Sequence, residues 1–235
     1  DAFFYPKYTS VVCISNRVRE SLLQHVPGLK STPVIPNGID IPLFREAVPL
    51  QREILVPSYR RGDRLLMMNA RFVPAKDHNT LLKAMQLLPE NVHLLLLGAG
   101  PLGAEYSKFC EQHGLQQRVH FLGVRKDVPE LLATVDIIVH SSHYEGFSIS
   151  MLEGMASGKP IVASSVPGIV DLVDQVAVLT EHENERELAA AIAGLLEDPK
   201  LAQEVATRCR EFVDSFSITN VSEMYLSLYR QCLNS

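Results

Sequence analysis

The segment that decides the fold reads Glu145-Gly146-Phe147-Ser148-Ile149-Ser150-Met151-Leu152-Glu153. An apolar run at residues 133–139 predicts a buried strand before it, and residues 155–163 predict a helix end followed by a new strand. The segment therefore lies where a strand ends and a helix begins, which is the edge at which open α/β sheets bind ligands. The first N–H groups of such a helix favour an anion, typically a phosphate. Because the two flanking glutamates can accept hydrogen bonds from sugar hydroxyls, the pattern is suited to a nucleotide sugar.

From residue 64 onward, short apolar runs alternate with segments of helical periodicity. The predicted strands cover residues 65–68, 92–97, 119–122, 136–140, 161–163 and 176–179. Because these runs are apolar on both faces, they favour a parallel sheet with helices on both sides. The sequence thus predicts an α/β fold, a Rossmann-like doubly wound parallel sheet, followed by helices at 199–215 and 219–233.

The first 58 residues have a different character. Residues 10–14 predict a strand, followed by a helix capped by Ser15 or Asn16, and residues 34–40 predict a short strand broken by a turn. Four prolines between residues 36 and 58 favour a hinge. We therefore expect residues 1–58 to be the tail of an N-terminal domain plus a hinge, 59–216 a nucleotide-sugar-binding domain, and 217–235 a C-terminal helix. Since the chain starts at Asp1, it is expected to be a piece of a longer protein.

Composition narrows the class of protein. Apolar residues make up 46% and charged residues 21% of the chain, values typical of a soluble globular protein. The net charge of −5 argues against a nucleic-acid partner, and the sequence has neither a signal peptide nor an apolar run that could span a bilayer. The cysteines, at positions 13, 110, 209 and 232, are scattered and predict reduced thiols rather than a disulfide frame or zinc site. These features predict a cytoplasmic protein.

Four segments, taken in order, resemble the C-terminal half of family 4 (group 1) glycosyltransferases, which have the two-domain GT-B architecture. Residues 34–40 are similar to the family's interdomain entry motif, and residues 121–125 to its F-L-G base-binding turn. Residues 69–77 resemble its G-R-L-x-x-x-K-G segment, with Ala70 and Asp77 in place of the usual glycines. Residues 145–153 are similar to its E-x7-E motif. The resemblance covers nearly the whole chain.

The resemblance implies roles for individual residues. Arg71 and Lys76 would hold the donor diphosphate, Glu145 would lie beside the donor sugar, and Glu153 would bind the ribose. Main-chain groups would contact the sugar or phosphates at Gly146, Phe147 and Ser148, and the base at Gly123, Val124 and Arg125. Charge agrees with this assignment, because a leaving nucleoside diphosphate needs cations. The chain has no Asp-x-Asp motif, so we expect no metal and no cofactor, with Arg71, Lys76 and Glu145 as the catalytic residues.

The function implied is that of a retaining hexosyltransferase of polysaccharide biosynthesis. The donor would be a UDP-sugar in preference to a GDP- or ADP-sugar, and the acceptor a glycan or a lipid-linked glycan bound through the missing N-terminal domain. The isolated chain would turn over poorly, and the full-length protein would associate peripherally with the inner face of the membrane. Retention in the family proceeds by front-face substitution or by double displacement, so Glu145 is not assigned as a nucleophile. Ser148, where glycine is common, and the Val166-Pro167-Gly168 loop leave the sugar specificity open.

The same residues allow other interpretations. The two glutamates could belong to a solvated helix, but the segment between them is apolar and the neighbouring motifs match in order. A glycosidase also uses two carboxylates, but it would not explain Arg71 and Lys76. Residues 97–103 match G-x-G-x-x-G, yet no acidic residue follows at the spacing a dinucleotide site requires, so they predict a tight turn lining the cleft. His140 and His143 are expected to be packed or solvated, and Asp136 to cap or anchor its strand. A nucleotide-sugar epimerase of GT-B architecture and a non-catalytic nucleotide-binding module remain as alternatives.

Overall fold

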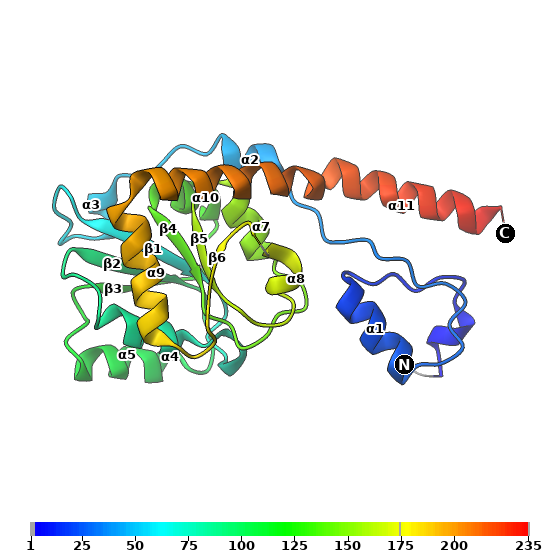
Figure 1. Ribbon diagram of the computed structural model, residues 1–235, viewed down its shortest axis with the longest axis horizontal. Helices are drawn as coiled ribbons and strands as arrows, with labels where there is room; N and C mark the ends of the chain where they lie inside the picture. The colour runs from blue at the N-terminus through cyan, green and yellow to red at the C-terminus, as the bar shows by residue number, and fades with distance from the viewer. Residues whose placement is uncertain (1–2, 174, 235) are drawn as a thin grey trace.

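The computed structural model describes residues 3–173 and 175–234 and contains a six-stranded, all-parallel sheet (Figure 1). The strands are β1 Arg64–Asn69, β2 Val92–Leu97, β3 Val119–Gly123, β4 Ile137–His140, β5 Ile161–Ser164 and β6 Val178–Thr180. Their order in the sheet is β3-β2-β1-β4-β5-β6, which confirms the predicted doubly wound fold. The sixth strand begins two residues later than predicted, at Val178.

The sheet is buried on both faces, as the apolar runs predicted. In β2 and β4 every residue is buried, and in β1 the four central residues are. The covering helices are α4 His78–Met85, α5 Gly103–Gln112, α6 Val128–Thr134, α7 Ile149–Ala156, α8 Val170–Val173, α9 Glu185–Glu197 and α10 Pro199–Phe212. Because the order of strands reverses between β1 and β4, the loops after these two strands form the switch point where such sheets bind ligands.

The N-terminal segment contains less regular structure than predicted. Backbone hydrogen bonds join residues 11–13 to residues 31–35, but they form one isolated bridge, between Cys13 and Val34. The strand expected at residues 10–14 is therefore wrong, because a strand needs a longer run of paired residues. Helix α1, Asn16–His25, follows the 3₁₀ turn η1, Tyr5–Lys7, and Ser15 is its cap, accepting a hydrogen bond from the Val18 amide at 3.2 Å. Figure 1 shows this segment beside the sheet domain, and an extended coil connects the two.

The predicted hinge contains two short helices, α2 Ile41–Arg45 and α3 Arg52–Leu55, that periodicity did not reveal. Apolar side chains from this region, including Ile41, Phe44 and Val56, belong to the hydrophobic core of the sheet domain. Part of the predicted hinge therefore packs on the sheet, and the division of the chain at residue 58 stays a prediction. Asp136 anchors the sheet as expected, because its Oδ2 accepts a hydrogen bond from the Leu65 amide at 2.7 Å and from Arg52 at 2.9 Å.

The C-terminal part continues from α10 through the 3₁₀ turn η3, Val213–Phe216, into α11, Ile218–Leu233. Phe212 and Phe216 pack together, with ring centroids 5.3 Å apart. Tyr229 is 58% exposed on α11, which runs past the sheet domain (Figure 1). Within the described ranges, no helix combines the length and the apolar character needed to cross a membrane.

Candidate functional site

The loops at the carboxyl ends of β1 and β2 are held together by glycine backbone. A Cβ at Gly98 would overlap the Ala70 carbonyl oxygen, and one at Gly100 would overlap that of Phe72. Gly98 also has φ +127°, which disfavours other residues. The glycines of residues 97–103 therefore let two loops approach each other closely, and this close approach explains the G-x-G pattern without a dinucleotide.

Two of the predicted site residues form an ion pair. Lys76 Nζ donates to Glu145 Oε1, and the Ser142 hydroxyl donates to the same oxygen at 3.1 Å. The side chains of Lys76 and Glu145 are only 21% and 10% exposed. The pair joins the loop after β1 to the loop after β4, which are neighbouring strands at the switch point.

Arg71 lies in the same loop as Lys76 and is exposed. Its side chain makes no hydrogen bond or ion pair to any residue in the described ranges. Its charge is therefore available to a ligand, whereas that of Lys76 is shared with Glu145.

The backbone of Glu145 packs directly against Gly168. A Cβ at Gly168 would overlap the Glu145 carbonyl oxygen, and its φ of +86° is left-handed. Beneath the pair lies His140, fully enclosed at the end of β4. Burial lowers the pKa of His140 to about 4, and the nearby Glu145 charge opposes that shift only in part.

Helix α7 starts beside the ion pair. Its N-cap residue, Ser148, is buried and makes no side-chain capping hydrogen bond, because its hydroxyl contacts the Ser150 hydroxyl at 3.2 Å instead. Among residues 3–173 and 175–234, no side chain caps the first N–H groups of α7, so these groups are available to an anion. Gly146 is exposed, and Phe147 packs against Phe216 with ring centroids 5.8 Å apart.

Glu153 lies one to two turns into α7 and is partly buried. Burial raises the pKa of its carboxyl group. Among the residues the structure describes, none donates a hydrogen bond to this carboxylate. A partly buried carboxylate without donors is a ready acceptor for ligand hydroxyl groups.

The end of β3 and the turn after it contain the three residues predicted to contact the base, Gly123, Val124 and Arg125. Gly123 has φ +65°, and its carbonyl accepts from the Gly98 amide at 2.8 Å. Val124 is 80% exposed. The Arg125 guanidinium is bound to Asp127 by two hydrogen bonds of 2.8 and 2.5 Å, which lower the pKa of that aspartate.

A pocket of about 470 Å³ separates the N-terminal segment from the sheet domain. Gly146, Phe147 and Gly168 line one side of it, and residues at the start of α1 line the other. Arg17 pairs with Asp171 at 2.6 Å across this pocket. Sequence reasoning missed both residues, because nothing in the sequence relates positions 154 residues apart.

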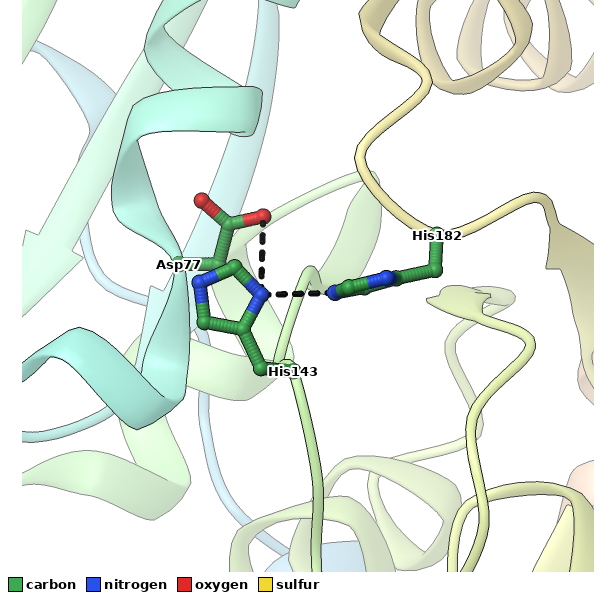
Figure 2. Close-up of side chains that lie close together, drawn as sticks. All are labelled: Asp77, His143 and His182. Carbon is green, nitrogen blue, oxygen red and sulfur yellow. Dashed lines mark hydrogen bonds and ion pairs between the residues drawn. The ribbon is translucent and has the colours of Figure 1, made fainter.

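Sequence reasoning also missed a cluster beside the ion pair. Figure 2 shows Asp77, His143 and His182 converging from three loops. His143 was expected to be packed or solvated, and no role was assigned to His182.

The fold and the site define an α/β domain of the GT-B glycosyltransferase type. A sequence model of the family described as glycosyl transferases group 1 matches residues 53–212, and the chain belongs to that family.

Individual relatives agree with this membership. The chain is 29% identical over 175 residues to the N,N'-diacetylbacillosaminyl-diphospho-undecaprenol alpha-1,3-N-acetylgalactosaminyltransferase of Campylobacter jejuni, covering 73% of this chain and 46% of the relative. It is 26% identical over 236 residues to the UDP-Gal:alpha-D-GlcNAc-diphosphoundecaprenol alpha-1,3-galactosyltransferase of Escherichia coli, covering 94% and 60%. The crystal structure of Anabaena Alr3699/HepE with UDP and glucose superposes with a TM-score of 0.83 at 25% identity, over 95% of this chain and 63% of that one. The chain spans about half the length of the curated relatives it matches.

Proposed function

We propose that this chain is the donor-binding domain of a retaining hexosyltransferase, with a UDP-sugar as donor in preference to a GDP- or ADP-sugar. The acceptor would be a glycan or a lipid-linked glycan. The observation that carries the proposal is the Lys76–Glu145 ion pair at the switch point, with the unpaired Arg71 in the same loop. Relatives named for UDP-galactose and for diphosphoundecaprenol acceptors support the donor and acceptor classes.

In this proposal Arg71 and Lys76 stabilise the leaving diphosphate. Transfer places negative charge on the departing phosphate oxygens, and cations held close to them lower the barrier. Arg71 needs no rearrangement, whereas Lys76 exchanges part of its interaction with Glu145 for the phosphate. The uncapped N–H groups of α7 and the amides of Gly146 to Ser148 add donors to the same anion. The diphosphate clamp therefore needs no metal ion.

The two glutamates take different roles. Glu145, held by Lys76 and Ser142, faces the donor sugar and stabilises positive charge that develops there. Glu153 accepts hydrogen bonds from the ribose hydroxyls. These hydroxyls would supply donors to a partly buried carboxylate that has none from the described residues. Main-chain groups of Gly123, Val124 and Arg125 hold the base.

The remaining parts of the proposal concern the whole protein. We assign acceptor binding to the domain that precedes this sheet domain, so the isolated chain binds donor and transfers poorly. A cytoplasmic setting, with peripheral association at the inner membrane face, fits the buried thiols of Cys13, Cys110 and Cys209, which form no disulfide.

The test uses the full-length protein with UDP-linked hexoses and a diphospholipid acceptor. The proposal predicts a glycosylated lipid whose new bond keeps the anomeric configuration of the donor, read by NMR. A donor sugar that is epimerised without acceptor would identify an epimerase instead. If donor binds and no acceptor or epimer product forms, the chain is a binding module.

A further inference from the structure

Three side chains with metal-binding atoms converge next to the Lys76–Glu145 pair (Figure 2). Asp77 lies between the 3₁₀ turn η2, Pro74–Lys76, and α4, His143 lies between β4 and α7, and His182 follows β6. His143 Nδ1 is 2.6 Å from His182 Nε2 and 3.8 Å from Asp77 Oδ2. One ligand atom from each residue falls within 4.8 Å of the other two.

Asp77 points into this cluster one carboxylate oxygen that accepts no hydrogen bond from the described residues. Its side chain is 5% exposed, and one oxygen, Oδ1, accepts a hydrogen bond from the Thr80 amide at 3.2 Å. The other oxygen, Oδ2, is buried without a hydrogen bond from the described residues, and it points toward His143 (Figure 2). A buried carboxylate oxygen without a partner is costly, and a cation at this point would remove that cost.

The two imidazole rings present nitrogen atoms to each other rather than stacking. The rings are 4.9 Å apart with an interplanar angle of 81°. Two arrangements bring such nitrogens together: one ring donates its N–H to the other, or both lone pairs bind one metal ion. A protonated His143 would face Asp77 Oδ2 at 3.8 Å, which is too long for a hydrogen bond, whereas a metal ion would bind all three atoms.

We propose that Asp77, His143 and His182 bind a divalent transition-metal ion of the zinc type. Two imidazole nitrogens and a carboxylate oxygen form the donor set of three-ligand zinc sites, which leave a fourth position open. Metal–ligand distances of about 2.0–2.2 Å place tetrahedral ligand atoms roughly 3.3 Å apart. The separations of 2.6 and 3.8 Å lie on either side of that value, and all three ligand atoms lie within 4.8 Å of one another, so side-chain rotations would be needed to close the site around an ion.

The fourth position has a candidate of its own. Glu183 Oε1 lies 3.6 Å from His143 Nδ1, and its side chain is 63% exposed and therefore able to move. A water molecule or a ligand oxygen could take the same position.

The metal would join three loops around the ion pair. Asp77 directly follows Lys76, and His143 precedes Glu145 by two residues. The His143 amide already donates to the Ala75 carbonyl at 2.9 Å, so the first two loops are linked by backbone before any metal binds. The ion would add the loop after β6 to this link. The proposed ion differs from a metal that bridges the donor diphosphate. The sequence argued against such a bridging metal, because it contains no Asp-x-Asp motif.

The experiment is a titration of Zn²⁺ into untagged, chelator-treated protein, followed by calorimetry and by competition with a coloured chelator. The proposal predicts one equivalent per chain with micromolar or tighter affinity, and no comparable binding of Mg²⁺. His182→Gln should weaken Zn²⁺ binding by about 100-fold. Changing a residue that only supports a metal ligand costs about 10- to 100-fold in affinity, and loss of a direct ligand should cost at least the upper value. His113→Gln is the matched control, because His113 is exposed and hydrogen-bonded only within its own helix region.

Circular dichroism establishes that each variant is folded before it is compared. Asp77→Asn is a second variant, which should also weaken Zn²⁺ binding by at least tenfold. Absence of stoichiometric Zn²⁺ binding to the wild type would overturn the proposal and leave a histidine–histidine hydrogen bond. Equal affinity in the wild type and His182→Gln would overturn it as well, by placing the ion elsewhere. Neither result bears on donor binding, so the proposed function is tested separately.

Discussion

Lys76 Nζ donates a hydrogen bond to Glu145 Oε1 across the switch point between β1 and β4. In the proposed mechanism Lys76 binds the diphosphate and Glu145 faces the sugar, so the ion pair links the two parts of the donor. The Ser142 hydroxyl fixes the shared oxygen from a third direction. The pair sets the distance between the diphosphate and the donor sugar in the proposed mechanism.

The first prediction concerns this competition. Glu145→Gln removes the negative charge that holds Lys76 and repels a diphosphate, so UDP should bind as tightly as to the wild type or up to about tenfold more tightly, since a charged hydrogen bond is worth about 1.5–3 kcal/mol. Transfer by the full-length protein should fall by about 10²–10³-fold, as for other lost charge-stabilising groups. Calorimetry and initial rates give the two values. UDP binding weakened tenfold or more would show that Glu145 supports the nucleotide instead.

The second prediction concerns the backbone behind Glu145. Gly168→Ala places a methyl group against the Glu145 carbonyl at a left-handed φ, so the free energy of unfolding should fall by about 2–4 kcal/mol. Gly114→Ala is the control, because Gly114 has φ +69° but nothing within 4 Å of the added carbon. It should cost only about 1 kcal/mol of left-handed strain. Urea unfolding of both variants measures the difference, and equal losses would mean that strain alone matters.

The third prediction is a loss of stability in mild acid. Burial lowers the pKa values of His78, His120 and His140 from 6.5 to about 4, so these rings stay neutral in the folded chain. The unfolded chain binds these protons as the pH falls below about 6.5, so stability is present above that pH and is lost between about 6.5 and 4. Each histidine contributes at most on the order of 3 kcal/mol.

Urea unfolding at a series of pH values measures this slope. Replacing one ring, as in His120→Gln, should flatten the slope even if it lowers stability at neutral pH. A slope that His120→Gln leaves unchanged would contradict the assignment of that proton uptake.

The fourth prediction separates folding from binding. Asp136 is bound by Arg52 and by the Leu65 amide, at the sheet edge opposite the site. Asp136→Ala leaves a partly buried arginine without its partner, which should lower the free energy of unfolding by about 2–4 kcal/mol. Nucleotide affinity of the folded variant should stay within twofold of the wild type. A larger change in affinity would connect the two edges of the sheet.

Strands and site motifs could be predicted from sequence where a local pattern dictates the structure. The run at residues 92–97 favours a buried strand because its length suits a strand better than a helix, and it forms β2, in which every residue is buried. The run at residues 10–14 gave the same signal and failed, because pairing depends on a partner strand that the local pattern does not encode. The helices at Ile41–Arg45 and Arg52–Leu55 are too short for periodicity to show.

The site divides in the same way. The motifs placed Arg71, Lys76 and Glu145 in the loops after strands and Glu153 in the following helix. The contact between Lys76 and Glu145 spans 69 positions and follows from the order of the strands. The approach of His143 to His182, 39 positions apart, depends on a loop that no motif describes. From the sequence, Gly168 stood out only as part of a loop that departs from the family pattern. The structure shows why a glycine is needed there, because a Cβ at this position would overlap the Glu145 carbonyl oxygen.

The most direct test is calorimetric titration of UDP, GDP and ADP into the wild type and Arg71→Ala/Lys76→Ala, without added metal. The control is Arg61→Ala/Lys83→Ala, which removes the same charges from exposed positions outside the site loops. The account predicts selective binding of UDP, weakened about ten- to a hundredfold in the first double variant and unchanged in the control. Equal UDP affinity in all three proteins, or no nucleotide binding by the full-length protein, would contradict it.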